Sequence, residues 1–338
     1  MSFEELPDDL LIKLFNTASP RDVSRAKRVN RRFHQLVETY NLGKPRVKEF
    51  SIESRASITP GQIGRIRFGN AANSHKRRLI VTMKRDKGVK RMEKVEEEEG
   101  NASCSQEVET RGFVEQNMRK VVLEDKLSFD GVDINDDFYR MLTAKWNDLR
   151  HVNTLSLSFC QIRINWQQFV DLLSRMTLKH LYLDFCTFDT SIISDKVFMS
   201  LKHLETIKIQ PRVHCYLNEL TDQTLSYWSQ IHQIPTTLQI YNCASGITVE
   251  GIKSLMMQVV SCQQDTINPI IDWDFGLVFE PTSNDSVLLS IIFSPGIQLT
   301  VTDDFRSRRI KLHKKQFQVA FNIFTPIPQL TQQIPTTN

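Results

Sequence analysis

A short pattern that recurs through the middle of the chain constrains the fold more than any other feature. Residues 155–160 read LSLSFC, and 26 residues later residues 181–186 read LYLDFC. Because alternate residues are apolar, each copy predicts a short β-strand with one buried face. Further copies, the last of them weaker, are Ile207 with Ile209, then Leu238 with Ile240 and Cys243, and, upstream, Leu127 with Phe129 and Val132.

Helical stretches separate these predicted strands. Residues 138–149, 166–173, 193–201 and 249–259 each carry apolar side chains at a spacing that places them on one face of a helix. A strand–helix unit of this length cannot enclose its apolar face alone, so the units must stack on one another. The pattern predicts a protein of the α/β class in which residues 119–261 form a curved αβ solenoid.

The first 45 residues predict a separate module of three short helices. Pro7 and the acids after it indicate a helix that begins near Asp8. Ser19, Pro20 and Asp22 have the spacing of a capping box for a second helix. Three short helices bury little of their own surface, so this module should gain stability by docking against a partner. The apolar face of the third helix consists of Phe33, Leu36, Val37 and Tyr40, and Gly43 with Pro45 ends the helix.

The order and spacing of these residues resemble an F-box, the three-helix motif that docks on the Skp-type linker of SCF ubiquitin ligases. The resemblance spans residues 6–37 and is carried by Leu6-Pro7, Asp9, Leu14-Phe15, PRDV at 20–23 and VNRRF at 29–33. The family usually has cysteine where Asn30 stands and often tryptophan where Phe33 stands. The resemblance implies that the linker-docking surface is formed or supported by Leu6, Pro7, Leu10, Leu14, Val23, Val29 and Phe33.

The same region is basic, which leaves a DNA-reading helix-turn-helix open as an alternative. A reading helix needs polar side chains that reach base edges, and here the charges are accompanied by one Asn and one His. Charge alone suits an acidic protein partner equally well, so nucleic acid is the less favoured partner. The basic residues are Arg21, Arg25, Lys27, Arg28, Arg31 and Arg32.

The repeats resemble the cysteine-containing class of leucine-rich repeats found in many F-box proteins. The likeness is clearest in residues 238–252, where one residue is inserted between Cys243 and Ile247. In such repeats the position after the strand holds Asn or Cys and points inward. The resemblance implies buried structural thiols at Cys160, Cys186 and Cys243, and zinc binding is disfavoured because the chain has no CxxC or paired histidines.

The remaining segments give weaker patterns. Residues 46–118 predict a β-rich linker, partly disordered, with a basic stretch at 76–94 followed by an acidic loop. The basic stretch favours a solvated hairpin, and a nuclear-import signal is the alternative. Residues 262–324 predict antiparallel strands that cap the solenoid, and residues 325–338, rich in Pro, Gln and Thr, predict a disordered tail.

Composition limits the compartment and the chemistry. The chain has 43 Lys plus Arg against 39 Asp plus Glu, a net charge of +4 that is too small to imply a polyanionic partner for the whole protein. We expect no secretory signal, no membrane partner, and reduced thiols in the cytoplasm and/or nucleus. The sequence contains no nucleotide-binding, hydrolase or metalloprotease motif, so we expect no catalytic residues, no cofactor and no metal.

These features predict a substrate-recognition adaptor of an SCF ubiquitin ligase. The F-box would bind the Skp-type linker, and through it the cullin, while the repeat domain binds a protein target whose identity is unknown. A leucine-rich-repeat binding protein outside any ligase is the alternative and would use the same face. The predicted target-binding residues, on the strand-lined concave face, are Tyr182, Asp184, Lys208 and Tyr241.

Overall fold

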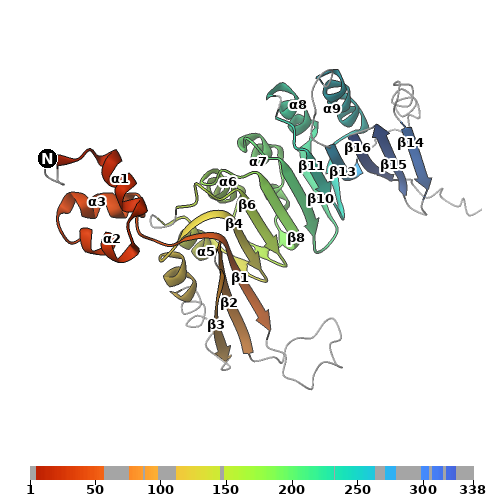
Figure 1. The fold of residues 1–338 in the computed structure, drawn as a ribbon. Helices are drawn as coiled ribbons and strands as arrows, with labels where there is room; N and C mark the ends of the chain where they lie inside the picture. The colour runs from red at the N-terminus through yellow and green to blue at the C-terminus, as the bar shows by residue number, and fades with distance from the viewer. Residues whose placement is uncertain are drawn as a thin grey trace, which may run out of the picture. The chain divides into compact units, whose positions relative to one another are not determined.

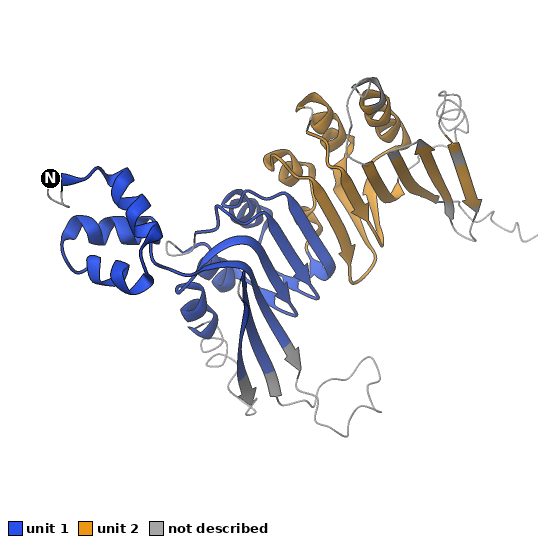
Figure 2. Ribbon diagram, in the orientation of Figure 1, with its two compact units in different colours: residues 1–188 blue, residues 189–338 orange. Residues whose placement is uncertain are grey.

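A computed structural model describes most of the chain. The described residues are 5–56, 76–86, 88–97, 112–144, 148–231, 233–262, 271–278, 298–303, 307–314 and 317–324. They fall into two compact units, residues 1–188 and residues 189–338, which Figure 2 colours separately. Much of the predicted acidic loop, residues 279–297 of the predicted antiparallel cap and the tail at 325–338 lie outside the described residues, and the predicted domain boundaries stay predictions.

Three helices open unit 1, as predicted (Figure 1). The first begins at Asp8, and the second follows the capping residue Ser19, whose side chain accepts a hydrogen bond from the Asp22 amide at 3.2 Å. The third follows Asn30, whose side chain accepts a bond from the Phe33 amide at 2.8 Å. Asn30 thus caps the third helix. The helices are α1 (Asp8–Thr17), α2 (Pro20–Ala26) and α3 (Arg31–Thr39).

The strands of unit 1 form one row in which the sequence repeats pair directly. Leu127, Leu155 and Leu181 are neighbours across three parallel strands. A strand that the sequence indicated only as a short extended segment joins them, pairing Phe50 with Leu127 in parallel. The parallel strands are β1 (Arg46–Ala56), β4 (Val122–Asp130), β6 (Thr154–Ser158) and β8 (His180–Phe188), and the hairpin β2 (Lys76–Arg85) and β3 (Gly88–Glu97) pairs antiparallel with β1.

Helices and short second strands complete the unit 1 repeats. The predicted helical stretches at 138–149 and 166–173 overlap α5 (Asp136–Leu142) and α6 (Trp166–Ser174), each of which buries one apolar face. A helical segment at 112–118 was not predicted. The short strands β5 (Asp133–Ile134) and β7 (Gln161–Ile162) pair with each other in parallel.

Unit 2 repeats the alternation and then changes to an antiparallel arrangement. Leu238 pairs with Ile207, again joining equivalent repeat positions. The strands β9, β11, β13 and β16 are parallel neighbours, and β14, β15 and β16 are antiparallel. The elements are η2 (Thr190–Ile192), α7 (Asp195–Ser200), β9 (Thr206–Pro211), β10 (Cys215–Thr221), α8 (Asp222–Ile231), β11 (Thr237–Ile240), β12 (Cys243–Gly246), α9 (Val249–Cys262), β13 (Ile271–Val278), β14 (Gln298–Asp303), β15 (Ser307–Lys314) and β16 (Phe317–Phe324).

Two aspartates, the buried Asp195 and the half-buried Asp222, join consecutive helices of unit 2. Asp195 opens α7 and accepts bonds from the Thr221 amide at 2.8 Å and from the Thr224 hydroxyl at 2.6 Å. Asp222 opens α8 and accepts from the amide and hydroxyl of Thr248, at 2.8 and 2.6 Å. Each repeat therefore holds the start of the next helix through one aspartate. None of the described helices is long and apolar enough to span a membrane.

Candidate functional site

The N-terminal helical module, residues 5–45, has a filled apolar core. The rings of Phe15 and Phe33 meet edge to face with centroids 5.5 Å apart. Two residues that the resemblance assigned to the docking surface, Val23 and Phe33, lie inside this core at 1% and 2% exposure, so they can act only by holding the helices in place. The buried members are Leu11, Phe15, Val23, Phe33, Leu36, Val37 and Leu42.

Other apolar side chains of the predicted docking surface face outward. Leu10 and Leu14, one turn apart on α1, are 48% and 42% exposed, and Val29 is 64% exposed. Because the core closes without them, the module can fold without burying these three side chains. Large apolar side chains gathered on a small module are typical of a protein-binding surface.

The segment that precedes α1 is fixed by α3. Arg32 donates from Nη2 to the Leu6 carbonyl at 2.6 Å and from Nε to the Asp8 carboxylate at 2.9 Å. Leu6 is half-buried against the core and Pro7 is exposed. The arginine therefore fixes Leu6 and Pro7 at the start of α1, although the two lie outside the helices.

Basic residues of the module are paired with acids or exposed, and Arg25 is both, since it is exposed and lies 3.7 Å from the Asp22 carboxylate. Arg32 is paired with Asp8, and Lys27 with Glu38. The Lys27 bond outweighs burial and lowers the pKa of the Glu38 carboxyl. The exposed guanidinium groups that a helix-turn-helix would use are those of Arg21, Arg25, Arg28 and Arg31.

In unit 1 the strand register places polar side chains in rows across neighbouring strands. One row, of half-buried residues, runs from β1 to β8 through Ser51, Ser128, Ser156 and Tyr182. The row two residues further along the strands contains three carboxylates among its four side chains, those of Glu53, Asp130, Ser158 and Asp184. Two predicted target-binding residues, Tyr182 and Asp184, thus belong to adjacent rows of one strand face.

In unit 2 the other two predicted target-binding residues differ in setting. Lys208 is half-buried on β9, opposite Gln239 of β11. Tyr241, which follows β11, is 39% exposed and borders a pocket of about 260 Å³ together with Asp274 and Arg309. Burial, and then the negative charge of Asp274, raises the pKa of the Tyr241 phenol.

The pocket beside Tyr241 contains a nearly buried ion pair. The two terminal nitrogens of Arg309 bind the two carboxylate oxygens of Asp274, one of them at 3.0 Å. The Asp274 side chain is 10% exposed, and its Oδ1 also accepts from the Gly276 amide at 3.1 Å. No sequence pattern predicts this pair, because its members are 35 positions apart on β13 and β15.

Two exposed phenylalanines in unit 1 were not among the predicted site residues. Phe159 and Phe185 are 62% and 41% exposed, and their rings are stacked with centroids 5.3 Å apart and planes at 7°. The available signal was the repeat itself, since both residues stand immediately before the repeat cysteine.

The repeat cysteines are buried, as the resemblance implied. Cys160 and Cys186 lie close to backbone carbonyls of the preceding strand, those of Phe129 at 3.5 Å and Leu157 at 3.3 Å. Cys243 is also buried and lies 3.9 Å from Cys215, sulfur to sulfur. The structure therefore gives these thiols packing contacts, and no cluster of His, Cys, Asp or Glu suited to a metal occurs among the described residues.

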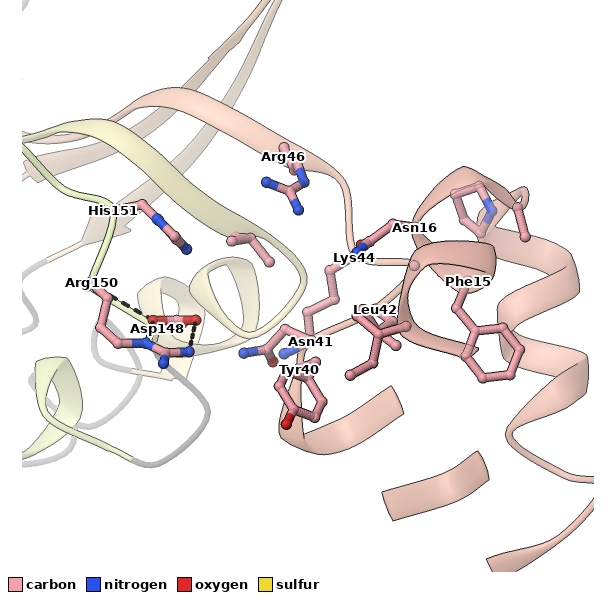
Figure 3. Close-up of a pocket in the computed structure, with 15 residues that line it drawn as sticks. Phe15, Asn16, Tyr40, Asn41, Leu42, Lys44, Arg46, Asp148, Arg150 and His151 are labelled. Carbon is pink, nitrogen blue, oxygen red and sulfur yellow. Dashed lines mark hydrogen bonds and ion pairs between the residues drawn. The ribbon is translucent and has the colours of Figure 1, made fainter. Parts of the chain in front are cut away.

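A crevice of about 370 Å³ lies where the N-terminal helical module meets the strands of unit 1 (Figure 3). Arg150 and Asp148 form a two-bond ion pair at its edge, at 2.9 Å for each bond. Arg46 pairs with Glu124, and burial lowers the pKa of the Lys44 ammonium. The crevice is polar and basic, in contrast to the apolar surface of α1.

The basic stretch at 76–94, for which nuclear import is the alternative, begins on strand β2. This strand is hydrogen-bonded to β1 on one side and to β3 on the other. Lys84 and Arg85 are exposed near the turn of this hairpin. The predicted basic hairpin is therefore present, and nuclear import stays a prediction.

Comparison with known proteins identifies the N-terminal module. The model of the F-box-like family matches residues 3–42. These residues contain all three helices of the module and its exposed apolar positions on α1. A search of the curated proteins found no significant match to the chain.

Proposed function

We propose that this protein is a substrate-recognition adaptor of an SCF ubiquitin ligase. Its F-box-like module docks on the Skp-type linker, which connects it to the cullin, and the strand face of the remainder binds a protein target. The adaptor contributes no catalytic residue of its own. It raises the effective concentration of the target near the ubiquitin carrier, which supplies the rate.

The observation that carries this proposal is the exposed apolar surface of a module whose core is already filled. Leu10, Leu14 and Val29 remain outside the core cluster, and Leu6 and Pro7 are fixed beside α1 by Arg32. Burial of such side chains in an interface is favourable at roughly 25 cal/mol per Å² before the costs of association. A partner that covers them accounts for their exposure.

For the remainder we propose a leucine-rich-repeat type solenoid with an antiparallel β cap. Equivalent repeat positions pair directly between parallel strands in each unit, and β14, β15 and β16 are antiparallel. We further propose a reduced environment, in the cytoplasm and/or nucleus, for the repeat thiols. Four described cysteines are free, which supports this proposal.

Co-purification tests the docking surface. The double variant Leu10→Ser, Leu14→Ser in the full chain should lose the Skp-type linker and cullin, because it removes the outward apolar groups and leaves the core intact. Lys13→Ser changes an exposed position of the same helix and serves as the matched control. Circular dichroism verifies folding of both proteins. Retention of the linker by a folded double variant would show that this face is not the docking surface.

The helix-turn-helix alternative predicts a different result. Arg21, Arg25, Arg28 and Arg31 are exposed and could contact phosphates. In that case the full chain would be retained on duplex DNA in a strongly salt-dependent manner, and a variant with these four arginines changed to glutamine would be released. Loss of the linker in the leucine variant with no retention on DNA favours the adaptor.

A further inference from the structure

We propose that the stacked rings of Phe159 and Phe185, with the carboxylate row beside them, form a docking site for an arginine-bearing segment of a protein target. The proposal rests on the proposed function, because it assigns a chemistry to the target that the adaptor recognises. The site, named here the aromatic corner, consists of Phe159, Phe185, Asp130 and Asp184.

The backbone does not require phenylalanine at these positions. Phe159 and Phe185 both have φ of 52°, in the left-handed region that bulky side chains disfavour. The equivalent corner after β4 is occupied by Gly131 (φ 66°), and the corner after β11 by Asn242 (φ 55°), residue types that adopt this conformation readily. Two phenylalanines in these corners therefore need another reason.

The core does not explain the phenylalanines either. Their rings are 62% and 41% exposed, while the cysteines that follow them, Cys160 and Cys186, are at most 1% exposed. The two rings contact each other as an offset, nearly parallel pair. The backbone holds this pair firmly, because the Phe159 amide donates to the Asp184 carbonyl at 2.8 Å. The result is a fixed, exposed aromatic platform.

The charge beside the platform indicates the partner. Asp130, the last residue of β4, and Asp184 of β8 lie in the same row, on either side of Ser158, and directly precede the corner residues Gly131 and Phe185. Carboxylates repel an acidic segment and attract a basic one. An arginine fits best, because its planar guanidinium can stack on a phenyl ring and also form a two-bond pair with a carboxylate. Lysine offers only a point charge.

Selection of binding peptides tests the aromatic corner. The full chain, bound to the Skp-type linker, is used to select from a phage-displayed library of random peptides. We expect enrichment of arginine next to an apolar or aromatic residue. Phe159→Asn with Phe185→Asn should weaken the selected peptides by roughly tenfold or more, the size expected for an aromatic anchor. Tyr216→Thr, which removes another exposed aromatic ring, is the matched control.

The asparagine variant also separates binding from folding. Because asparagine suits the left-handed corner, as Asn242 shows, the thermal midpoint should stay the same or rise. A fall in the midpoint would mean that the rings are structural and would overturn the proposal. Asp130→Asn with Asp184→Asn should remove the preference for arginine while apolar selection persists.

Other outcomes overturn the proposal as well. They are enrichment of acidic or uncharged peptides, and absence of any enrichment relative to the Phe159→Asn, Phe185→Asn double variant. Linker binding is measured on the same samples. Loss of the linker contradicts the adaptor function, whereas a retained linker with no arginine preference contradicts only the aromatic corner.

Discussion

The two units use the same left-handed corner to support different surfaces. In unit 1 the corner after β6 carries the exposed ring of Phe159, and a corner within β8 carries that of Phe185. In unit 2, Asn242 and Gly276 occupy such corners, and both border the pocket that contains the Asp274–Arg309 pair. The repeat fixes the path of the backbone at a corner, whereas the side chain there is free to change. Surface chemistry can therefore differ between units that share one backbone plan.

The largest effect should come from a glycine corner that has no room for a side chain. At Gly276 (φ 66°) a Cβ atom would lie 2.3 Å from the Ile240 carbonyl oxygen. We expect Gly276→Ala to lower the free energy of unfolding by about 3 kcal/mol, because strain and a backbone clash combine. Chemical denaturation measures the change.

Gly131 in unit 1 provides the parallel test, since a Cβ there would lie 2.5 Å from the Ser54 carbonyl oxygen. Gly88→Ala is the control, because its surroundings are open although its φ of 147° is also positive. If Gly131→Ala and Gly276→Ala lower the free energy of unfolding no more than Gly88→Ala does, the backbone at these corners is not rigid.

The second largest effect should come from the aspartates that join consecutive helices, because these are buried to different degrees in the two units. Asp195 in unit 2 is 8% exposed and satisfies the hydroxyl of the fully buried Thr224. Asp195→Ala should cost about 2 kcal/mol in unfolding free energy, because it leaves buried donors without an acceptor.

In unit 1 the corresponding link is an exposed hydrogen bond of 2.9 Å, which the side-chain amide of Gln168 donates to the Asp136 carboxylate. Asp136→Ala is therefore the matched control, with an expected cost below about 1 kcal/mol. Equal costs in thermal and urea unfolding would remove this distinction between the units.

The sequence predicted the elements that follow a simple period and missed those that depend on distant contacts. The alternation at Leu155 and Leu181 predicted strands that pair in register, and Ser19 with Asp22 predicted the start of α2. By contrast α8 was missed, since its start is held by the buried Asp195, one repeat earlier.

The candidate site was predictable only in part for a related reason. Leu10 and Leu14 could be assigned by resemblance, but no pattern shows that Val23 turns inward, because helical spacing alone does not say which flank meets the core. The aromatic corner depends on a backbone conformation, φ of 52° at Phe159, that a phenylalanine in the sequence does not suggest.

A smaller effect should follow from exchanging the corner residues of the two units. Asn242→Phe places the residue of unit 1 in unit 2, where the side chain loses its bond of 3.3 Å to the Pro211 carbonyl and gains backbone strain. We expect a cost of about 1 kcal/mol in unfolding free energy, with Asn242→Gly within about 0.5 kcal/mol of the wild type. Stabilisation by Asn242→Phe in thermal unfolding would show that phenylalanine suits the corner by itself.

The two units should also differ in the reactivity of their cysteine thiols, a difference that does not involve the stability of the fold. Cys160 and Cys186 of unit 1 are buried; of the two unit 2 cysteines whose side chains the structure describes, Cys243 is buried and Cys215 is half-exposed. The contact with Cys243 lowers the pKa of the Cys215 thiol and raises that of Cys243. A lowered pKa increases the thiolate fraction at a given pH, so Cys215 should react with iodoacetamide before Cys160, Cys186 and Cys243, and its rate should rise at a lower pH than that of a free thiol.

Mass spectrometry of the alkylated native protein can test this order. Cys160, Cys186 and Cys243 should be modified only slowly until the chain unfolds, because their sulfur atoms are not accessible to the reagent. A Cys215→Ser variant should lose the modified Cys215 peptide and leave the slow modification of the other three unchanged. Fast modification of Cys160 or Cys186 in the folded variant would mean that the thiols of unit 1 are not the sealed, structural groups that distinguish them from Cys215.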